Sequence, residues 1–313
     1  MNDVAGGLPT YYEQAAVKHS LWGAKVSIYM FVAGLAGSSQ IVAAAADLAG
    51  GAATQGIVRR GRFIALAGAL VGGPLLIVDL HTPQRFYNML RIFRRTSPMS
   101  IGTYVLMSFG ALSAFLAAVE AAKIRGPLPG ALERAAKVAQ VPAAVAGAAM
   151  STYTGARLAA TSTPLWASAP RLIAAAFGAS AMSSAAAALT IGEESEEAQA
   201  ALDRLSLVAE TAELCLLSGL RGRFREAEVD GVLRETGWGP AYDIAVAALG
   251  AGLPLGLRVS GTKSPGLRLV GALAVLAGAF ALRHVLLRAG NESAKRPRDY
   301  FRVTRRTSPP RTA

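Results

Sequence analysis

Residues 75–118 read LLIVDLHTPQRFYNMLRIFRRTSPMSIGTYVLMSFGALSAFLAA, a short basic segment between two apolar runs. The whole chain repeats this pattern, with 52% hydrophobic and 17% charged residues. A soluble domain of 313 residues would need far more polar surface to cover its core. The charges gather between apolar segments about as long as the ~20 residues that span hydrocarbon. The sequence therefore predicts a polytopic membrane protein.

The apolar segments predict an all-α fold, a polytopic bundle of about eight transmembrane helices. The expected spans are residues 26–48, 62–80, 101–122, 136–158, 166–191, 198–219, 241–258 and 267–288. The sixth span is the most polar, and its helical spacing would let its charged groups face the bundle interior. An even number of spans places both termini on one side of the membrane.

The net charge of +12 is explained by topology and by contact with anionic lipid headgroups. Lysines and arginines are more numerous on the side of the termini, which favours cytoplasmic termini. Much of that excess comes from the tail, residues 290–313, which is expected to be basic and disordered. Nucleic acid is not an expected partner, because no basic surface interleaved with aromatic residues is present.

Several cofactor chemistries do not fit this composition. The chain has three histidines and one cysteine, whereas a membrane b-type haem needs two axial histidines within the spans and an iron–sulfur cluster usually needs four thiolates. We therefore expect neither haem nor an iron–sulfur cluster in this chain, and no metal site. Zinc-ligand spacing, a P-loop and a nucleophile elbow are also lacking.

Polar groups within or at the ends of the spans are the remaining candidates for chemistry. Six of them are expected toward the terminus side: Tyr29, Asp79, Tyr153, Glu213, Asp243 and His284. An intramembrane carboxylate such as Glu213 is costly unless it is paired, hydrated or protonated. Glu210 lies one helical turn earlier, so both acids share a face. This suggests a proton or water path, with a structural ion pair to Arg204 or another basic group as the alternative.

Three stretches together resemble the NrfD/PsrC family of polysulfide-reductase-type membrane subunits. They are WGAKVSIYMFVAGLAGSS at 22–39, LLIVDLHTPQRFYNMLRIFRRTSPMSIGTY at 75–104, and STYTGARLAATSTPLW at 151–166. The second is similar to the family's Asp-Leu-x-x-Pro-x-Arg-Phe element, which is followed by Ser-Pro-Met-Ser-x-Gly. The resemblance covers about residues 11–166, and beyond that region it consists mainly of the number of spans.

The resemblance implies a quinone-reactive membrane subunit of two four-helix bundles with no cofactor of its own. It divides the chain into an N-terminal interfacial segment (1–25), a first bundle with the quinone site (26–158), a second bundle (166–289) and the tail (290–313). The implied partners are a ferredoxin-like iron–sulfur subunit and a catalytic subunit, often a molybdopterin oxidoreductase. The implied location is the bacterial cytoplasmic (inner) membrane.

The same resemblance implies roles for individual residues. The quinone site, for menaquinone or ubiquinone, falls between the first and fourth spans, at Tyr29 and Tyr153, with Asp79 bordering it. Tyr29 stands where the relative has histidine, which keeps a hydrogen-bonding group but not an easily protonated one. Proton-transfer candidates are Asp79, His81, Glu210 and Glu213. Partner-docking candidates are Arg85, Arg91, Arg94 and Arg95, which also serve to fix topology.

Two other functions remain open from the residues alone. One is a transporter or ion-translocating module, which would use the same carboxylates as a pathway. The other is a passive membrane anchor whose quinone site has decayed, an alternative that the histidine-to-tyrosine change at Tyr29 supports. An enzyme carrying its own cofactor is the least expected of the readings.

Overall fold

The computed structural model describes residues 17–18, 20, 22–80, 82–261 and 264–307, with side chains up to residue 303. Within this part of the chain the structure is helical and contains no strand. Residues 1–16 of the expected interfacial segment, His81 and residues 308–313 lie outside the described residues. The prediction of an all-α polytopic membrane bundle is confirmed.

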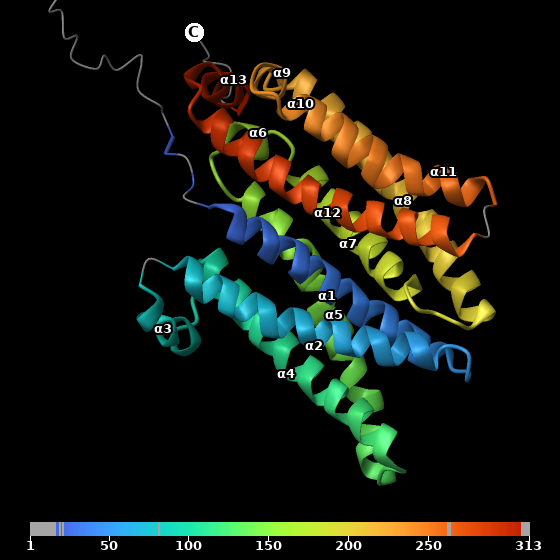
Figure 1. Ribbon diagram of the computed structural model, residues 1–313. Helices are drawn as coiled ribbons and strands as arrows, with labels where there is room; N and C mark the ends of the chain where they lie inside the picture. Colours follow the sequence, from blue (N-terminus) through green and yellow to red (C-terminus); the bar gives the residue numbers. More distant parts are fainter. Residues whose placement is uncertain (1–16, 19, 21, 81, 262–263, 308–313) are drawn as a thin grey trace, which may run out of the picture.

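Eight long rods follow one another in the expected order (Figure 1). They are α1 (Ala24–Ala49), α2 (Gln55–Asp79), α4 (Pro98–Arg125), α5 (Gly130–Ala159), α7 (Pro170–Thr190), α8 (Glu196–Glu226), a composite rod and α12 (Pro265–Ala294). The composite rod joins α10 (Trp238–Pro240), the π-helix η2 (Ala241–Gly252) and α11 (Leu253–Val259). Short helices lie between or after the rods: η1 (Pro83–Arg85), α3 (Tyr87–Arg91), α6 (Pro164–Ala167), α9 (Gly231–Glu235) and α13 (Pro297–Thr307).

Six of the rods in the described chain are long and apolar enough to cross a membrane: α1, α2, α4, α7, the composite rod and α12. The other two, α5 and α8, have 30 and 31 residues and are long enough at about 1.5 Å per residue. Both carry charged residues in their first turns, Glu133 in α5 and Glu196 and Glu197 in α8. Composition alone marks six helices because α5 has polar residues through its second half, and because α8 also carries charged residues along its length, Asp203, Arg204, Glu210 and Glu213.

Most of the rods extend beyond the expected spans because backbone hydrogen bonding continues past the apolar residues, whereas α7 is shorter than the expected span 166–191. Helix α8 ends at Glu226, although the sixth span was expected to end at residue 219. Its start is set by Ser195, whose side chain accepts a hydrogen bond from the Ala198 amide at 3.3 Å, a typical N-cap. Two glutamates follow in the first turn, where they favour the helix dipole.

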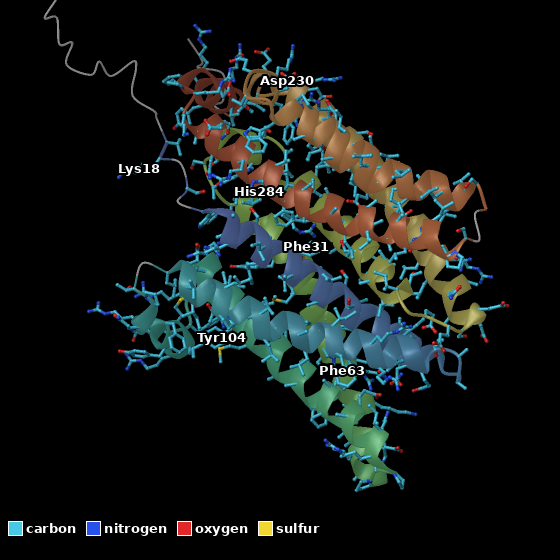
Figure 2. All side chains as sticks on the ribbon, viewed as in Figure 1. Lys18, Phe31, Phe63, Tyr104, Asp230 and His284 are labelled. Atoms are coloured by element: carbon cyan, nitrogen blue, oxygen red, sulfur yellow. The ribbon has the colours of Figure 1, made fainter. Side chains whose placement is uncertain are left out.

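The rods form two packed groups that meet along α1, α5, α7 and α12. The first group contains α1, α2, α4 and α5, and the second contains α7, α8, the composite rod and α12. Figure 1 shows the first group below and the second above, and α1 of the first group contacts α7 and α12 of the second. Figure 2 labels Phe31 and His284 at this junction. The arrangement agrees with the two four-helix bundles implied by the family resemblance.

Glycine permits the closest approach within the first bundle. A Cβ atom added to Gly37 of α1 would overlap the Gly147 carbonyl of α5, and one added to Gly147 would overlap the carbonyl of Gly37. Without side chains at these positions the two backbones touch, as small residues allow in membrane helices. This contact fixes α1 against α5, the two helices expected to carry Tyr29 and Tyr153.

The two ends of the bundle differ. One end carries the described residues before α1 (17–18, 20 and 22–23), which we call the N-terminal segment, together with the basic loop (residues 82–97, with η1 and α3), α6, α9 and α13. The opposite end carries the connections from α1 to α2, α4 to α5, α7 to α8 and α11 to α12 (Figure 1). We call these the terminus end and the far end.

The tail differs from the expected disorder. Helix α12 continues to Ala294, and α13 covers Pro297–Thr307. Proline at the first position and Asp299 in the first turn both favour a helix start, and α13 packs on α6 and α12. Helices α12 and α13 therefore cover most of residues 290–307, where the sequence predicted a disordered tail.

Candidate functional site

A cavity of about 560 Å³ opens in the first bundle at the terminus end. Its walls come from α1, α2, α4 and α5, and the N-terminal segment and the basic loop complete it. Most lining side chains are apolar, and the polar ones are Ser20, Tyr29, Asp79, Thr103, Tyr153 and Arg157. The volume lies in the range of ~300–1,000 Å³ typical of small-molecule sites, which combine apolar walls with a few polar groups.

Tyr29 enters the cavity from α1 and is 3% exposed. Its ring lies over Gly72 of α2, where an added Cβ atom would be 3.5 Å from two ring carbons. Within the described part of the chain, no hydrogen bond to the Tyr29 hydroxyl is found. A buried phenol normally has a partner, so this hydroxyl is available to a ligand in the cavity.

Tyr153 enters the same cavity from α5. Its hydroxyl donates a hydrogen bond to the Pro98 carbonyl, in the first turn of α4. Its ring occupies the space that a side chain at Gly102 would take, because a Cβ atom there would overlap the ring and the hydroxyl. Tyr29 and Tyr153 line the same cavity. The structure thus brings together the two tyrosines that the sequence placed in one site.

Opposite charges lie at the cavity wall. Asp79 is the last residue of α2, and Arg157 lies one turn after Tyr153 on α5. Neither forms an ion pair with another described residue. The Arg157 guanidinium lies over the Trp22 ring at 4.8 Å, a cation–π contact worth about 0.5–2 kcal/mol. A carboxylate and a guanidinium are therefore both available to a ligand.

The N-terminal segment closes the cavity on the side of the second bundle. The Ser20 hydroxyl donates a hydrogen bond to the Asn291 side-chain oxygen at 2.6 Å. Trp22 stacks on Trp166 with ring centroids 5.9 Å apart, and the Trp166 indole donates to the Leu286 carbonyl at 2.8 Å. Helix α12 thereby holds Ser20 and Trp22, two of the residues that line the cavity.

The basic loop forms another side of the cavity. Phe86, Met89 and Leu90 line it, and the Tyr104 hydroxyl anchors the loop by donating to the Leu90 carbonyl at 3.0 Å. Tyr104 of α4 is labelled in Figure 2 near this loop. The four arginines predicted to dock a partner are exposed, and none forms an ion pair among the described residues: Arg85, Arg91, Arg94 and Arg95.

Glu210 and Glu213 lie in the second bundle on α8 and do not line the cavity. Glu210 accepts hydrogen bonds from Arg258 of α11 at 3.0 and 3.2 Å. Arg258 also pairs with Asp203. The sequence left open an ion pair between Glu210 and a basic group, and Arg258 is that group.

Glu213 lies near the middle of α8 rather than toward the terminus end as expected, because the helix continues to Glu226. Its buried carboxylate lies close to Ser180 and Ser183 of α7 and to Arg283 of α12. The Arg283 side chain is fully buried and donates to the Met30 carbonyl at 3.1 Å and to the Phe177 carbonyl at 3.3 Å. This polar cluster joins α8 and α12 to α1 and α7.

The two remaining polar groups of the sequence analysis lie outside the cavity. Asp243 pairs with Arg221 at 3.3 Å and is exposed. The Nδ1 atom of His284 is 3.2 Å from the Ser27 hydroxyl of α1, and its ring contacts Phe280 and Trp238. His81, a predicted proton-transfer residue, lies outside the described residues.

Sequence reasoning missed Trp22, Gly102 and Arg157. Arg157 follows Tyr153 by four residues, a spacing that places two side chains on one helix face, so the sequence did contain a signal for it. Gly102 gives no such signal, because its role depends on a contact between α4 and α5. The role of Trp22 follows from a stack with Trp166, which is distant in sequence.

A protein-family model matches most of the chain. Within the described residues, no group of three or more His, Cys, Asp or Glu side chains is arranged to hold a metal ion. No curated protein matches the chain. The family model described as polysulphide reductase, NrfD, matches residues 13–293, which include both bundles and the cavity. The chain therefore belongs to the polysulphide reductase NrfD family.

Proposed function

We propose that this chain is the quinone-binding membrane subunit of an oxidoreductase complex and exchanges electrons with an iron–sulfur partner. The observation that carries the proposal is the cavity in the first bundle. Tyr29, Tyr153 and Asp79 were assigned to one quinone site from sequence, and side chains from α1, α5 and α2 meet there. The proposed location is the bacterial cytoplasmic membrane, as the family resemblance implies.

The residues of the cavity suit a quinone head group. A quinone carries two oxygens on an apolar ring, so a site needs hydrogen-bond donors near both oxygens and apolar walls for the ring and the isoprenoid tail. The Tyr29 hydroxyl and the Arg157 guanidinium are available donors, and the Tyr153 hydroxyl lies on the same wall as Arg157. Leu76, Leu106 and Met107 supply apolar surface.

Quinol oxidation releases two electrons and two protons, so the site also needs a proton acceptor. Asp79 is the acceptor that the structure favours, because it lines the cavity at the end of α2 and forms no ion pair among the described residues. His81 is proposed as a second group that exchanges protons with the quinol. Glu213 would extend a proton route into the second bundle, whereas the contacts of Glu210 with Arg258 favour a structural role.

Electrons would leave to, or arrive from, a partner at the terminus end. The basic loop lies beside the cavity there and presents exposed arginines. Unpaired arginines suit an acidic protein surface, because charge complementarity speeds and orients docking. The proposed partner is a ferredoxin-like iron–sulfur subunit, which connects this chain to a catalytic subunit, often a molybdopterin enzyme.

The test is substitution of Tyr153 by phenylalanine in the full chain, purified alone and with its partners. The matched control is Tyr242→Phe, which removes a buried hydroxyl that donates to the Leu217 carbonyl in the second bundle. With assembly unchanged, Tyr153→Phe should slow reduction of the partner's iron–sulfur clusters by a short-chain quinol, while Tyr242→Phe should not.

Equal rates for both variants would remove Tyr153 from the mechanism. Purified wild-type chain that binds no quinone would overturn the proposal and favour the passive anchor. Wild-type chain that binds quinone but exchanges no electrons with its partners would overturn only the electron-transfer half.

A further inference from the structure

A second cavity, of about 530 Å³, lies at the far end of the second bundle. It is lined by residues of α7, α8, α11 and α12, with the connection from α11 to α12 contributing Gly261. The quinone proposal uses none of these residues. The polar side chains on its walls are Thr190, Asp203, Arg204, Arg258 and Arg268.

The arginines of this cavity outnumber the nearby carboxylates. Arg258 is already held by Asp203 and Glu210. Arg268 hydrogen-bonds the Gln199 side chain and comes no closer than 3.9 Å to Asp203. Arg204 is exposed and forms no ion pair among the described residues. Among the residues that the structure describes, three guanidinium groups therefore face two carboxylates, which leaves one positive charge without a partner.

These charges lie near the far end of the second bundle. Arg204 lies about 12 Å along α8 from its first residue, at ~1.5 Å per residue, and Arg268 is in the first turn of α12. Apolar side chains form the rest of the wall, and those of Leu207 and Leu267 are 41% and 43% exposed. A ligand that fits must carry one negative charge and an apolar chain.

We propose that this cavity binds one anionic phospholipid. Its phosphate would lie between Arg204 and Arg268, and an acyl chain would follow Leu207 and Leu257 toward Gly271. A phosphodiester brings the single negative charge that balances the arginines, and basic pockets between membrane helices suit such head groups. A neutral quinone would leave the charge uncompensated, so a second quinone site fits less well.

The test measures lipid retained by the full-length chain in native mass spectrometry, with phosphatidylglycerol and phosphatidylcholine as probes. Arg204→Gln together with Arg268→Gln should weaken phosphatidylglycerol binding about 25-fold, at roughly fivefold for each arginine. Arg134→Gln is the matched control, since Arg134 is an exposed arginine at the same end on α5. Equal retention by the double variant and the control would overturn the proposal, as would equal affinity for the two lipids.

A second variant separates a lipid from a free anion. A Cβ atom at Gly271 would contact only Leu257, at 3.7 Å, so Gly271→Leu should fold and fill the acyl channel while leaving the arginines in place. It should lower phosphatidylglycerol retention and leave binding of inorganic phosphate unchanged. Unchanged lipid retention in Gly271→Leu, or displacement of the lipid from wild type by millimolar phosphate, would contradict the lipid assignment.

Discussion

Replacing Gly102 by alanine should disturb the proposed quinone site without replacing any polar residue that lines the cavity. A methyl group at this position would overlap the hydroxyl, Cζ and Cε1 atoms of Tyr153. Because non-bonded atoms approach comfortably at about 3.5 Å, the ring must retreat by about 1 Å or more. That shift moves the hydroxyl out of the place from which it donates to the Pro98 carbonyl.

The size of the effect follows from that displacement. Where the Tyr153 hydroxyl also hydrogen-bonds the quinone, the loss of that bond costs about 1 kcal/mol, or roughly fivefold in quinone affinity. A misplacement of ~1 Å in a reacting site can cost about 100-fold in turnover. We therefore expect the dissociation constant to rise about fivefold and quinol-linked turnover to fall by up to about 100-fold.

Gly110→Ala is the matched control on the same helix. A Cβ atom at Gly110 would meet only the Ala69 methyl group, at 3.8 Å, which is ordinary contact. Both substitutions gain up to about 1 kcal/mol of helix propensity. The difference between the two variants therefore isolates the displacement of Tyr153 from any general effect on α4.

The assay is quenching of tryptophan fluorescence by a short-chain quinone, since Trp22 lines the cavity. Partner-linked turnover is measured on the same preparations. If Gly102→Ala binds quinone and turns over as Gly110→Ala does, then either Tyr153 has no part in the site or the contact between α4 and α5 is looser than the structure shows. In both cases the reasoning from Gly102 fails.

The remaining predictions concern the terminus end. Changing the four arginines of the basic loop to glutamine should weaken retention of the proposed iron–sulfur partner and reduce the salt dependence of that retention. Arg134→Gln at the far end is the control and should leave co-purification unchanged. Equal retention by both variants would mean that the four arginines serve only to fix the membrane topology. Burial raises the pKa of the Asp299 carboxyl, and Arg296, 3.2 Å away, only partly opposes this. A carboxyl whose pKa is raised by folding destabilises the folded state increasingly as pH rises above its ordinary value of 3.8. Asp299→Asn should therefore melt higher than wild type near neutral pH and lose that advantage at acidic pH; a constant difference across pH would contradict it.

The order of the rods was predictable because it depends on hydrophobic length, a local property of the chain. Each expected span has a rod at its place, and the ends differ by a few residues where helices continue past the hydrocarbon. Glu213 is a residue whose predicted position was changed by that difference. Because α8 ends at Glu226 and not at residue 219, Glu213 moves from near one end of the helix to its middle.

The site was predictable only where one residue carries the information. Tyr29 and Tyr153 came from motifs, and the structure places both at the cavity. Two features of the site depend on residues that are distant in sequence. One is the space that Gly102 leaves for Tyr153, and the other is the hydrogen bond from Ser20 to Asn291. No pattern within one helix reveals such contacts, because they depend on how the bundles pack.

The second bundle has a direct effect on the site in the first. Arg283 of α12 donates to the carbonyl of Met30, the residue that follows Tyr29, and His284 contacts Ser27 one turn earlier. Asn291, two turns further along α12, holds Ser20. One helix of the second bundle thus sets the position of the start of α1 and of the segment before it. A change in the charge or packing of α12 must therefore reach Tyr29 through backbone contacts, and this gives the otherwise distant Glu213 and Arg283 cluster a physical route to the cavity.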